Sequence, residues 1–387
     1  MFRSKFSEDI FNHKYRHEGC ETWESLAKTL VADVCGDLMT RDECTDLAKA
    51  ITDMKFIPGG RYLYYAGRQN KFFNNCYLLK AEEDSRQDWA NLSWKAESCL
   101  MTGGGIGVDY SVYRHEGAPI QRTGGQASGP IPKIQMINEI GRRVMQGGSR
   151  RSAIYASLNW KHQDVGKFLS SKDWASMPVG NTGKSLWDIK QDDFNFPAPM
   201  DMTNISVNYD TEWLLNYYET GQVGKVFEEN VLQAMKTAEP GFSFNFFDKE
   251  NETLRNACTE VTSEDDSDVC NLGSLNFGRI ESLSELSDLV ELSTKFLICG
   301  TLKAHLPYEK VHETREKNRR LGLGFMGVHE WLIKRNYKYE VTQELHSWLS
   351  VYKGVSDKVS KEFAEELSVS TPVANRAIAP TGSIGIL

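Results

Sequence analysis

Few of the features that mark membrane, secreted or polynucleotide-binding proteins occur in this sequence. No segment reaches the roughly 18 consecutive apolar residues that a membrane-spanning helix needs. The first ten residues, Met1 to Ile10, hold no apolar stretch of the kind found in a secretory leader. Acidic residues outnumber basic ones by 53 to 45, which argues against a general nucleic-acid binder because such a protein needs a net basic face. The sequence therefore predicts a cytoplasmic protein with neither a membrane nor a nucleic acid as its partner.

Cysteine is present, but it is not arranged as a disulfide framework or a zinc site. The eight cysteines are spread over 387 residues, and no two of them form a Cys-x-x-Cys pair. Scattered thiols in a long chain are typical of a reducing compartment, where single cysteines can be reactive. No metal site is predicted from the sequence.

The chain has no internal repeat, low-complexity tract or Pro/Ser-rich linker, which indicates one continuous domain. Apolar residues at helical spacing predict helices over 22–54 (with a second helix starting at Thr40), 84–102, 130–146, 225–237, 283–304 and 342–366. Strands are predicted over 76–79, 152–160, 204–208, 242–247, 256–261 and 321–325. A long surface excursion is expected over 171–200. Strands that alternate with helices favour an α/β fold with a mainly parallel sheet or barrel.

The densest local signal is Asn256-Ala-Cys258-Thr-Glu260. In an extended segment, residues two apart point to the same side, so an amide, a thiol and a carboxylate would face one space. The amide can orient a substrate hydroxyl, the carboxylate can take its proton, and the thiol can act as a nucleophile or a hydrogen-atom donor. A polar strand face with a buried structural cysteine is the alternative.

Two further thiols, Cys76 and Cys270, lie beside Asn75 and a glycine turn respectively. If the fold brings them together, they can form a redox disulfide. The other five cysteines lie in or near apolar helical faces and are interpreted as structural.

Three segments are candidates for phosphate contacts. The glycine runs at 103–107 and 147–148 are not followed by Gly-Lys-Ser/Thr, which excludes a P-loop there. Arg150 and Arg151 place two guanidiniums on a loop, which suits phosphate or base contacts, although a solvated helix-to-strand connection is the alternative. The hydroxyls and backbone N–H groups of Thr381-Gly-Ser383 can meet a phosphate, with a plain turn as the alternative.

Nine motifs, taken in order, resemble the catalytic (large) subunit of ribonucleotide reductase from about Phe56 to the end of the chain. They are Pro58-Gly-Gly-Arg61, Asn75-Cys76, Asp84-Ser85, Gly103-Gly-Gly-Ile-Gly107, Gln146-Gly-Gly-Ser-Arg150, Asn256-x-Cys258-x-Glu260, Cys270-Asn-Leu-Gly-Ser274, Arg319-Arg-Leu-Gly-Leu-Gly-Phe-Met-Gly327 and Ala379-Pro-Thr-Gly-Ser383. The resemblance implies a ten-stranded α/β barrel with a central finger loop, formed by residues 56–387 and truncated at the carboxyl end. Residues 1–55 would be a helical segment, too short for the ATP cone of many relatives.

The resemblance also implies roles for single residues. Cys258 would carry the thiyl radical that removes the ribose 3′ hydrogen, Glu260 would deprotonate the 3′ hydroxyl, and Asn256 would hydrogen-bond the ribose. Cys76 and Cys270 would be the dithiol that reduces the 2′ carbon. Substrate contacts are implied for Asn75, Gly104, Pro380, Thr381, Gly382 and Ser383. Effector and specificity roles are implied for Asp84, Ser85, Gln146, Arg150 and Arg151.

The implied cofactor and partners follow from the same resemblance. Cys270 to Asn276 and the triple glycine at 103–105 resemble the adenosylcobalamin-dependent class, while a compact phage-type subunit that takes its radical from a separate metal-containing subunit stays open. The implied partners are a nucleoside di- or triphosphate, a deoxynucleotide effector, a thioredoxin- or glutaredoxin-like reductant and a second copy packed through 86–100 and 132–146. Because the chain ends where relatives continue, half of a split reductase that needs a C-terminal complementing chain is one alternative. A nucleotide-binding α/β thiol protein without radical chemistry is another.

Overall fold

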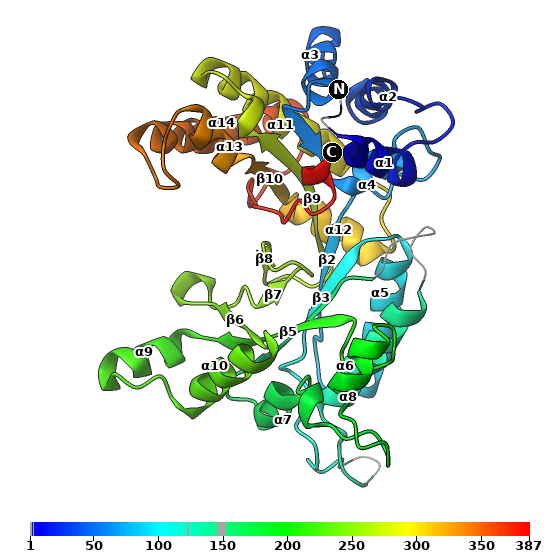
Figure 1. The fold of residues 1–387 in the computed structure, drawn as a ribbon, viewed down its shortest axis with the longest axis vertical. Coiled ribbons are helices and arrows are strands. Elements are labelled where there is room, and N and C mark those ends of the chain that lie inside the picture. The colour runs from blue at the N-terminus through cyan, green and yellow to red at the C-terminus, as the bar shows by residue number, and fades with distance from the viewer. Residues whose placement is uncertain (1, 3, 122–123, 145–151) are drawn as a thin grey trace. The chain divides into compact units, whose positions relative to one another are not determined.

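The computed structural model describes residues 2, 4–121, 124–144 and 152–387, which fall into two compact units (Figure 1). The first unit comprises residues 1–76 and 268–387, and the second comprises residues 77–267. No helix in the described part of the chain is long and apolar enough to cross a membrane.

The first unit is built around strand β9 (Asp268–Asn276). Strand β1 (Phe56–Pro58) pairs with β9 in antiparallel orientation, and β10 (Leu321–Met326) pairs with it in parallel orientation. Its helices are α1 (Lys5–Lys14), α2 (Trp23–Cys35), α3 (Arg41–Thr52), α4 (Gly60–Tyr65), α11 (Leu283–Lys303), α12 (Glu309–Asn318), α13 (Val328–Lys334) and α14 (Gln343–Glu366). Helix α11 packs on both β9 and β10 and also contacts α2, α3 and α14, so it forms the centre of this core.

The second unit contains a sheet in the order β2-β3-β4-β5-β6, and β3 to β6 run parallel. The strands are β2 (Cys76–Lys80), β3 (Gly105–Asp109), β4 (Ile154–Asn159), β5 (Thr203–Tyr209) and β6 (Gly241–Phe244). The helices between them are α5 (Arg86–Met101), α6 (Pro130–Arg143), α7 (Val165–Ser170), α8 (Leu186–Asp192), α9 (Thr211–Thr220) and α10 (Lys225–Thr237). Parallel strands joined by helices confirm the predicted α/β class.

Most predicted elements are confirmed because their signals are local. Thr40 caps α3 through a reciprocal capping box with Glu43, and Ser85 caps α5 by accepting a hydrogen bond from the backbone N–H of Asp88. Helix α10 has the predicted bounds, and α11 and α14 differ from theirs by one residue. The strand predicted over 256–261 is wrong, because those residues form a loop between two short strands.

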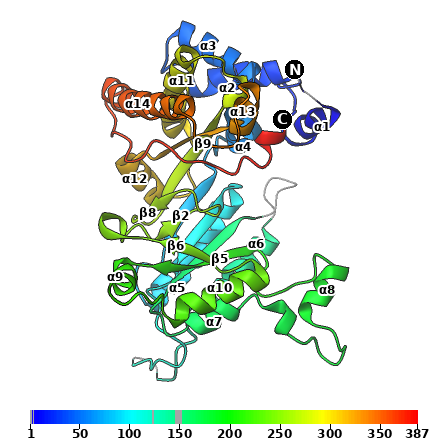
Figure 2. The ribbon, with the colours of Figure 1, turned by 60° about the vertical axis from the view of Figure 1, so that its left-hand side comes forward.

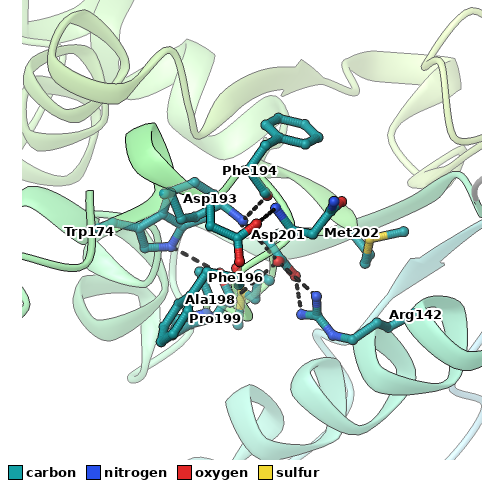
Figure 3. Close-up of polar contacts among 12 residues, drawn as sticks. Arg142, Trp174, Asp193, Phe194, Phe196, Ala198, Pro199, Asp201 and Met202 are labelled. Atoms are coloured by element: carbon teal, nitrogen blue, oxygen red, sulfur yellow. Dashed lines mark hydrogen bonds and ion pairs between the residues drawn. The ribbon is translucent and has the colours of Figure 1, made fainter. Parts of the chain in front are cut away.

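The excursion predicted over 171–200 contains helix α8 and is anchored at its carboxyl end. Figure 2 shows α8 extending away from the strands of its unit. The side chain of Asp201 is 5% exposed and accepts a hydrogen bond from Arg142 of α6 (Figure 3). It also accepts from Asn138 of α6 and from Lys190 of α8. Charge-assisted bonds of this kind hold the end of the excursion against α6.

Candidate active site

The candidate catalytic motif lies at the tip of a hairpin in the second unit. Strand β7 (Leu254–Arg255) pairs in antiparallel orientation with β8 (Thr262–Ser263), and six residues, 256–261, connect them. The turn is closed by Asn256, whose Oδ1 accepts from the Val261 backbone N–H at 3.1 Å and whose carbonyl accepts from the Thr259 N–H at 3.0 Å. Thr259 has a left-handed φ of 69°, so the chain reverses direction here. We call residues 254–263 the finger.

Two glycines of β3 make room for the finger. A Cβ at Gly107 would lie 1.7 Å from the carbonyl oxygen of Arg255, and a Cβ at Gly105 would lie 3.0 Å from the Cβ of Ala257. Residues two apart in a strand face the same side, so both glycines present bare backbone to the finger. The glycine run therefore has a packing role that its sequence alone did not indicate.

Polar bonds fix the base of the finger. The Arg255 guanidinium donates to Ser243 Oγ at 2.6 Å, and to the Phe244 carbonyl and Asn245 Oδ1 at 3.2 Å each. The side chain of Asn204 on β5 donates to the carbonyl of Ala257 at 3.4 Å. These contacts join the finger to two strands of the sheet and position its tip.

Two polar side chains of the finger are buried but lack hydrogen-bond partners. Among the described residues, nothing bonds to Asn256 Nδ2 or to either carboxyl oxygen of Glu260. Burial raises the pKa of Glu260; the Asn256 amide lies near enough to oppose this shift but not in hydrogen-bonding geometry. Leaving such groups unpaired costs about 1–3 kcal/mol each. A donor and an acceptor on one loop match a hydroxyl group, which both accepts and donates.

The thiol of Cys258 has a different environment from the other cysteines. Cys258 is exposed, whereas Cys20, Cys35, Cys76, Cys99, Cys270 and Cys299 are buried and Cys44 is intermediate. An exposed thiol between an amide and a carboxyl group of raised pKa is accessible to a reagent from outside the chain.

Cys76 and Cys270 lie on neighbouring segments of the first unit. The backbone N–H of Asn75 donates to the carbonyl of Cys270 at 3.3 Å, and both thiols are buried. Glycine again makes room, because a Cβ at Gly322 of β10 would lie 3.0 Å from Cys270 Sγ. The structure thus brings the two cysteine-bearing segments together.

The other residues predicted to contact the substrate are Asn75, Gly104 and residues 380–383. The carboxamide oxygen of Asn75 has no hydrogen-bond partner within the described ranges. Gly59 lies beside this oxygen, and a side chain at that position would contact it. The N–H of Gly104 donates to Thr102 Oγ1 at 3.4 Å. Near the carboxyl end, Ser383 Oγ accepts from the Tyr15 hydroxyl at 3.4 Å, and Pro380 and Gly382 are exposed. Thr381 has a left-handed φ of 51° and its carbonyl accepts from the Gly385 N–H, so this segment is a tight turn.

Asp84 and Ser85 line a cavity of about 540 Å³ in the second unit. Its other lining residues are Arg86, Trp89, Tyr113, Arg114, Ile120, Ala127, Ser128 and Gly129. Arg114 forms an ion pair with Asp84, and the rings of Trp89 and Tyr113 lie 5.0 Å apart. An aromatic wall and an arginine suit a ligand with a flat ring and a negative charge.

Most residues of this cavity were not predicted from the sequence. Trp89, Tyr113 and Arg114 belong to no motif. Trp89 lies one turn after Ser85 on α5, but only the long-range fold places Tyr113 and Arg114 beside Ser85. Trp89 also contacts α6, because the buried Lys133 of that helix donates to the Trp89 carbonyl and to Ser93 Oγ. Burial lowers the pKa of Lys133 to about 8. Gln146, Arg150 and Arg151 lie outside the described residues.

No cluster of metal-binding side chains occurs in the described ranges, where three or more His, Cys, Asp or Glu residues would have to meet.

Comparison with known proteins identifies this arrangement. Residues 74–189 and 202–366 match the family described as "Ribonucleotide reductase, barrel domain". A vitamin B12-dependent ribonucleoside-diphosphate reductase of Thermoplasma acidophilum is 26% identical over 370 residues, covering 88% of this chain and 47% of that protein. A putative adenosylcobalamin-dependent ribonucleoside-triphosphate reductase of Mycobacterium phage D29 is also 26% identical, over 71% of this chain and 44% of that protein. The chain thus spans about half the length of these relatives.

The fold agrees with a solved structure. The class Id ribonucleotide reductase alpha subunit of Actinobacillus ureae superposes with a TM-score of 0.78 at 17% identity, over 99% of this chain and 73% of that one. This confirms the expected reductase-type barrel fold. From the family match, the finger motif and the fold together, the chain belongs to the ribonucleotide reductase family, whose barrel domain it carries.

Proposed function

We propose that this chain reduces ribonucleotides to 2′-deoxyribonucleotides by thiyl-radical chemistry at Cys258. The observation that carries the proposal is the six-residue turn of the finger, which holds an exposed thiol at Cys258 together with the unpaired amide of Asn256 and the unpaired carboxyl of Glu260. Family membership supports it, because relatives that match most of this chain are named ribonucleoside-diphosphate or -triphosphate reductases.

Side chains of the finger carry out the first step of the reaction, the removal of the 3′ hydrogen atom. The Cys258 thiyl radical removes the hydrogen atom from the ribose 3′ carbon and becomes a thiol. Glu260 takes the proton of the 3′ hydroxyl, while the Asn256 amide donates to a ribose oxygen and orients the sugar. The raised pKa of Glu260 suits this role, since a base whose pKa lies closer to neutrality transfers protons more effectively in both directions.

The dithiol of Cys76 and Cys270 supplies the electrons. The 2′ hydroxyl leaves as water after protonation, and the two thiols give two electrons and end as a disulfide. Return of the hydrogen atom from Cys258 to the 3′ carbon regenerates the radical. A thioredoxin- or glutaredoxin-like dithiol would then reduce the disulfide for the next turnover.

For the phosphates and the effector we assign separate segments. The turn formed by Pro380, Thr381, Gly382 and Ser383 would hold the substrate phosphates through hydroxyl and N–H groups, with Asn75 and Gly104 contacting the sugar. The cavity at Asp84 and Ser85 would bind a deoxynucleotide effector, with the base against Trp89. Gln146, Arg150 and Arg151 would contact the substrate base.

We infer that adenosylcobalamin is the radical source. When bound, this cofactor supplies the radical that oxidises a cysteine thiol to a thiyl radical. The exposed thiol of Cys258 fits such a reagent, because it can be reached from outside the chain. A separate metal-containing subunit is the alternative source, since relatives named only as reductase alpha subunits, such as that of Chlamydia muridarum, also match.

We assign two surfaces of the second unit to the binding of partner chains. Trp94, Met101 and Met136 are 55%, 62% and 49% exposed on α5 and α6, beside a groove of about 520 Å³. We assign this face to a second copy of the chain. Phe242 and Phe244 on β6 are 36% and 45% exposed, and among the described strands β6 pairs only with β5. This edge suits a complementing polypeptide that adds a strand.

An assay on CDP and CTP, with and without adenosylcobalamin and in the presence of a dithiol, tests the proposal. Deoxynucleotide formed only with the cofactor supports both the activity and the radical source. No product from any combination, including one supplemented with a metal-containing subunit or the carboxyl-terminal half of a relative, would refute it. Nucleotide binding to the second unit, measured in parallel, separates an inactive chain from an unfolded one.

A further inference from the structure

A three-residue pattern, Ser-x-Asn, occurs at the ends of three neighbouring strands. It appears as Ser157-Leu-Asn159 on β4, Ser206-Val-Asn208 on β5 and Ser243-Phe-Asn245 at the end of β6. The register pairs Ser157 with Ser206, Asn159 with Asn208, and Asn208 with Ser243. Because partners in register and residues two apart share a face, these side chains form one polar ladder at the carboxyl edge of the sheet. We call them the Ser-Asn ladder.

Hydrogen bonds within the ladder leave one acceptor without a partner. Asn208 Nδ2 donates to Ser157 Oγ at 3.0 Å, and Asn245 Nδ2 donates to Ser243 Oγ at 3.3 Å. Asn245 Oδ1 accepts from Arg255. Asn208 is only 1% exposed, yet nothing in the described part of the chain bonds to its Oδ1. A buried carbonyl oxygen of this kind requires a donor from a ligand or a water molecule.

This acceptor lines a cavity of about 310 Å³ that has no part in the proposed reductase chemistry. The lining residues are Asn159, Lys161, Asn208, Tyr209, Asp210, Glu212, Asn245, Glu250, Asn251 and Thr253. The carboxyl ends of parallel strands are the usual place for small ligands in α/β sheets. The cavity is therefore where the fold itself favours binding.

The charges around the cavity favour a cation. Lys161 is the one basic residue in the lining, and it pairs with both Asp210 and Glu212 at 2.9 Å. Glu250 forms no ion pair within the described ranges. Among the described residues, the buried group without a partner, Asn208 Oδ1, and the one carboxylate of the lining without an ion pair, that of Glu250, are both acceptors. A metal ion fits less well, because it prefers several oxygen ligands and the Asp210 and Glu212 carboxylates are committed to Lys161.

We propose that this cavity binds a small organic amine, whose ammonium group donates to Asn208 Oδ1 and pairs with Glu250. An ammonium group carries three donors and no acceptor, which matches the two acceptors Asn208 Oδ1 and Glu250. The cavity of about 310 Å³ has room for a short diamine. Binding there would hold the ends of β4, β5 and β6 together. It would also affect the base of the finger, because Asn245 accepts a hydrogen bond from Arg255.

Calorimetric titration of the full chain with putrescine tests the proposal, with 1,4-butanediol as the neutral ligand of equal length. We expect saturable binding of putrescine and none of the diol. Asn208→Leu, which removes the acceptor at similar volume, should weaken binding by about tenfold or more. Glu250→Gln should weaken it by about threefold to tenfold. Asp248→Asn, which removes a nearby exposed acid outside the lining, should leave binding unchanged.

Several outcomes would overturn the proposal. They are no saturable binding of putrescine, equal binding of the diol, stronger binding of Mg²⁺ than of putrescine, or unchanged binding in both Asn208→Leu and Glu250→Gln. If Asn208→Leu fails to fold, the exposed pair Glu250→Gln and Asp248→Asn decides. Because no nucleotide takes part, failure of this proposal is independent of the reductase assay.

Discussion

Glu260 and Asp201 are two buried acids of the same unit with opposite environments. Asp201 accepts from Arg142, Asn138 and Lys190 (Figure 3). Burial alone would raise the pKa of Asp201, but these bonds outweigh it and hold the pKa below its ordinary value. Glu260 has no such bonds among the described residues, and burial raises its pKa. The protein supplies the partners of one acid, whereas the other has no partner in the described part of the chain, as its proposed role toward substrate requires.

The difference separates a structural polar cluster from the proposed catalytic one. Buried polar groups normally have hydrogen-bond partners, because burying a polar group without a partner destabilises the folded protein. The cluster around Asp201 follows this rule and fastens the end of an excursion to α6. The finger tip breaks the rule at Asn256 and Glu260, which is expected where a ligand supplies the missing partners.

The largest effect is expected at the thiol of the finger. Cys258→Ser should reduce deoxynucleotide formation by at least about 10³-fold, because a hydroxyl O–H bond is too strong for the hydrogen transfer. Nucleotide binding, measured by calorimetry, should stay within about threefold of the wild type. Cys44→Ser, which changes a partly exposed thiol of the first unit, serves as the control and should retain turnover. Turnover in Cys258→Ser equal to that in Cys44→Ser would refute the assignment.

A change in the support of the finger should cost less than a change at its tip. In Gly107→Ala, the added Cβ would overlap the Arg255 carbonyl and displace the finger. A displacement of about 1 Å costs on the order of 10²-fold in rate. Gly354→Ala is the matched control, since a Cβ there, on helix α14, meets nothing within 4 Å. This control should unfold at the same or a slightly higher temperature. Equal turnover in the two variants would show that the finger does not depend on the bare backbone of β3.

Breaking the paired cluster should affect stability and leave the chemistry unchanged. Asp201→Asn removes the partner of the nearly buried Arg142 and Lys190, so the free energy of unfolding should fall by about 3 kcal/mol. Denaturant titration measures this loss. Turnover per folded molecule should not change. Exposed Asp248→Asn should leave stability within about 0.5 kcal/mol of the wild type, and an equal loss in both variants would remove the contrast between the two acids.

The smallest effects are expected in the pH dependence, with opposite signs for the two acids. The lowered pKa of Asp201 stabilises the fold above its ordinary value of about 3.9, and this contribution is lost as pH falls through the lowered pKa. The raised pKa of Glu260 stabilises the fold below its ordinary value of about 4.3, and this contribution is lost as pH rises through the raised pKa.

The same shift sets the acid limb of catalysis. Glu260 acts as a base only when it is ionised, so turnover should fall as pH drops through its raised pKa. A pH–rate profile measures the limb, and unfolding curves at several pH values measure the stability terms. An acid limb at the ordinary pKa of a solvated glutamate would contradict the buried environment of Glu260.

Candidate catalytic residues could be named from the sequence, but the geometry of the segment that carries them could not be predicted. Capping by Thr40 and Ser85 depends on residues three positions away, so the starts of α3 and α5 followed from local pattern. The alternating face expected for 256–261 did not form, because Thr259 takes a left-handed conformation and turns the chain. The five residues of the motif, 256–260, contain no local pattern that favours a turn over a strand.

Contacts between distant segments were the other limit. Gly107 and Arg255 lie far apart in the sequence, so the role of the glycine run became visible only when the finger was in place against β3. The cavity at Ser85 likewise draws Trp89, Tyr113 and Arg114 from two segments that carry no shared motif. Local pattern predicted the secondary structure, whereas the walls of both sites depend on long-range packing.

The central claim is that the unpaired acid of the finger is kept for substrate at the expense of stability. Turnover and the free energy of unfolding of Glu260→Gln at pH 7 test this claim most directly. The neutral amide removes the cost of burying a charge but cannot accept a proton. Turnover should therefore fall by about 10²- to 10⁴-fold while the protein becomes more stable. Retained turnover, or a loss of stability like that expected for Asp201→Asn, would contradict the account.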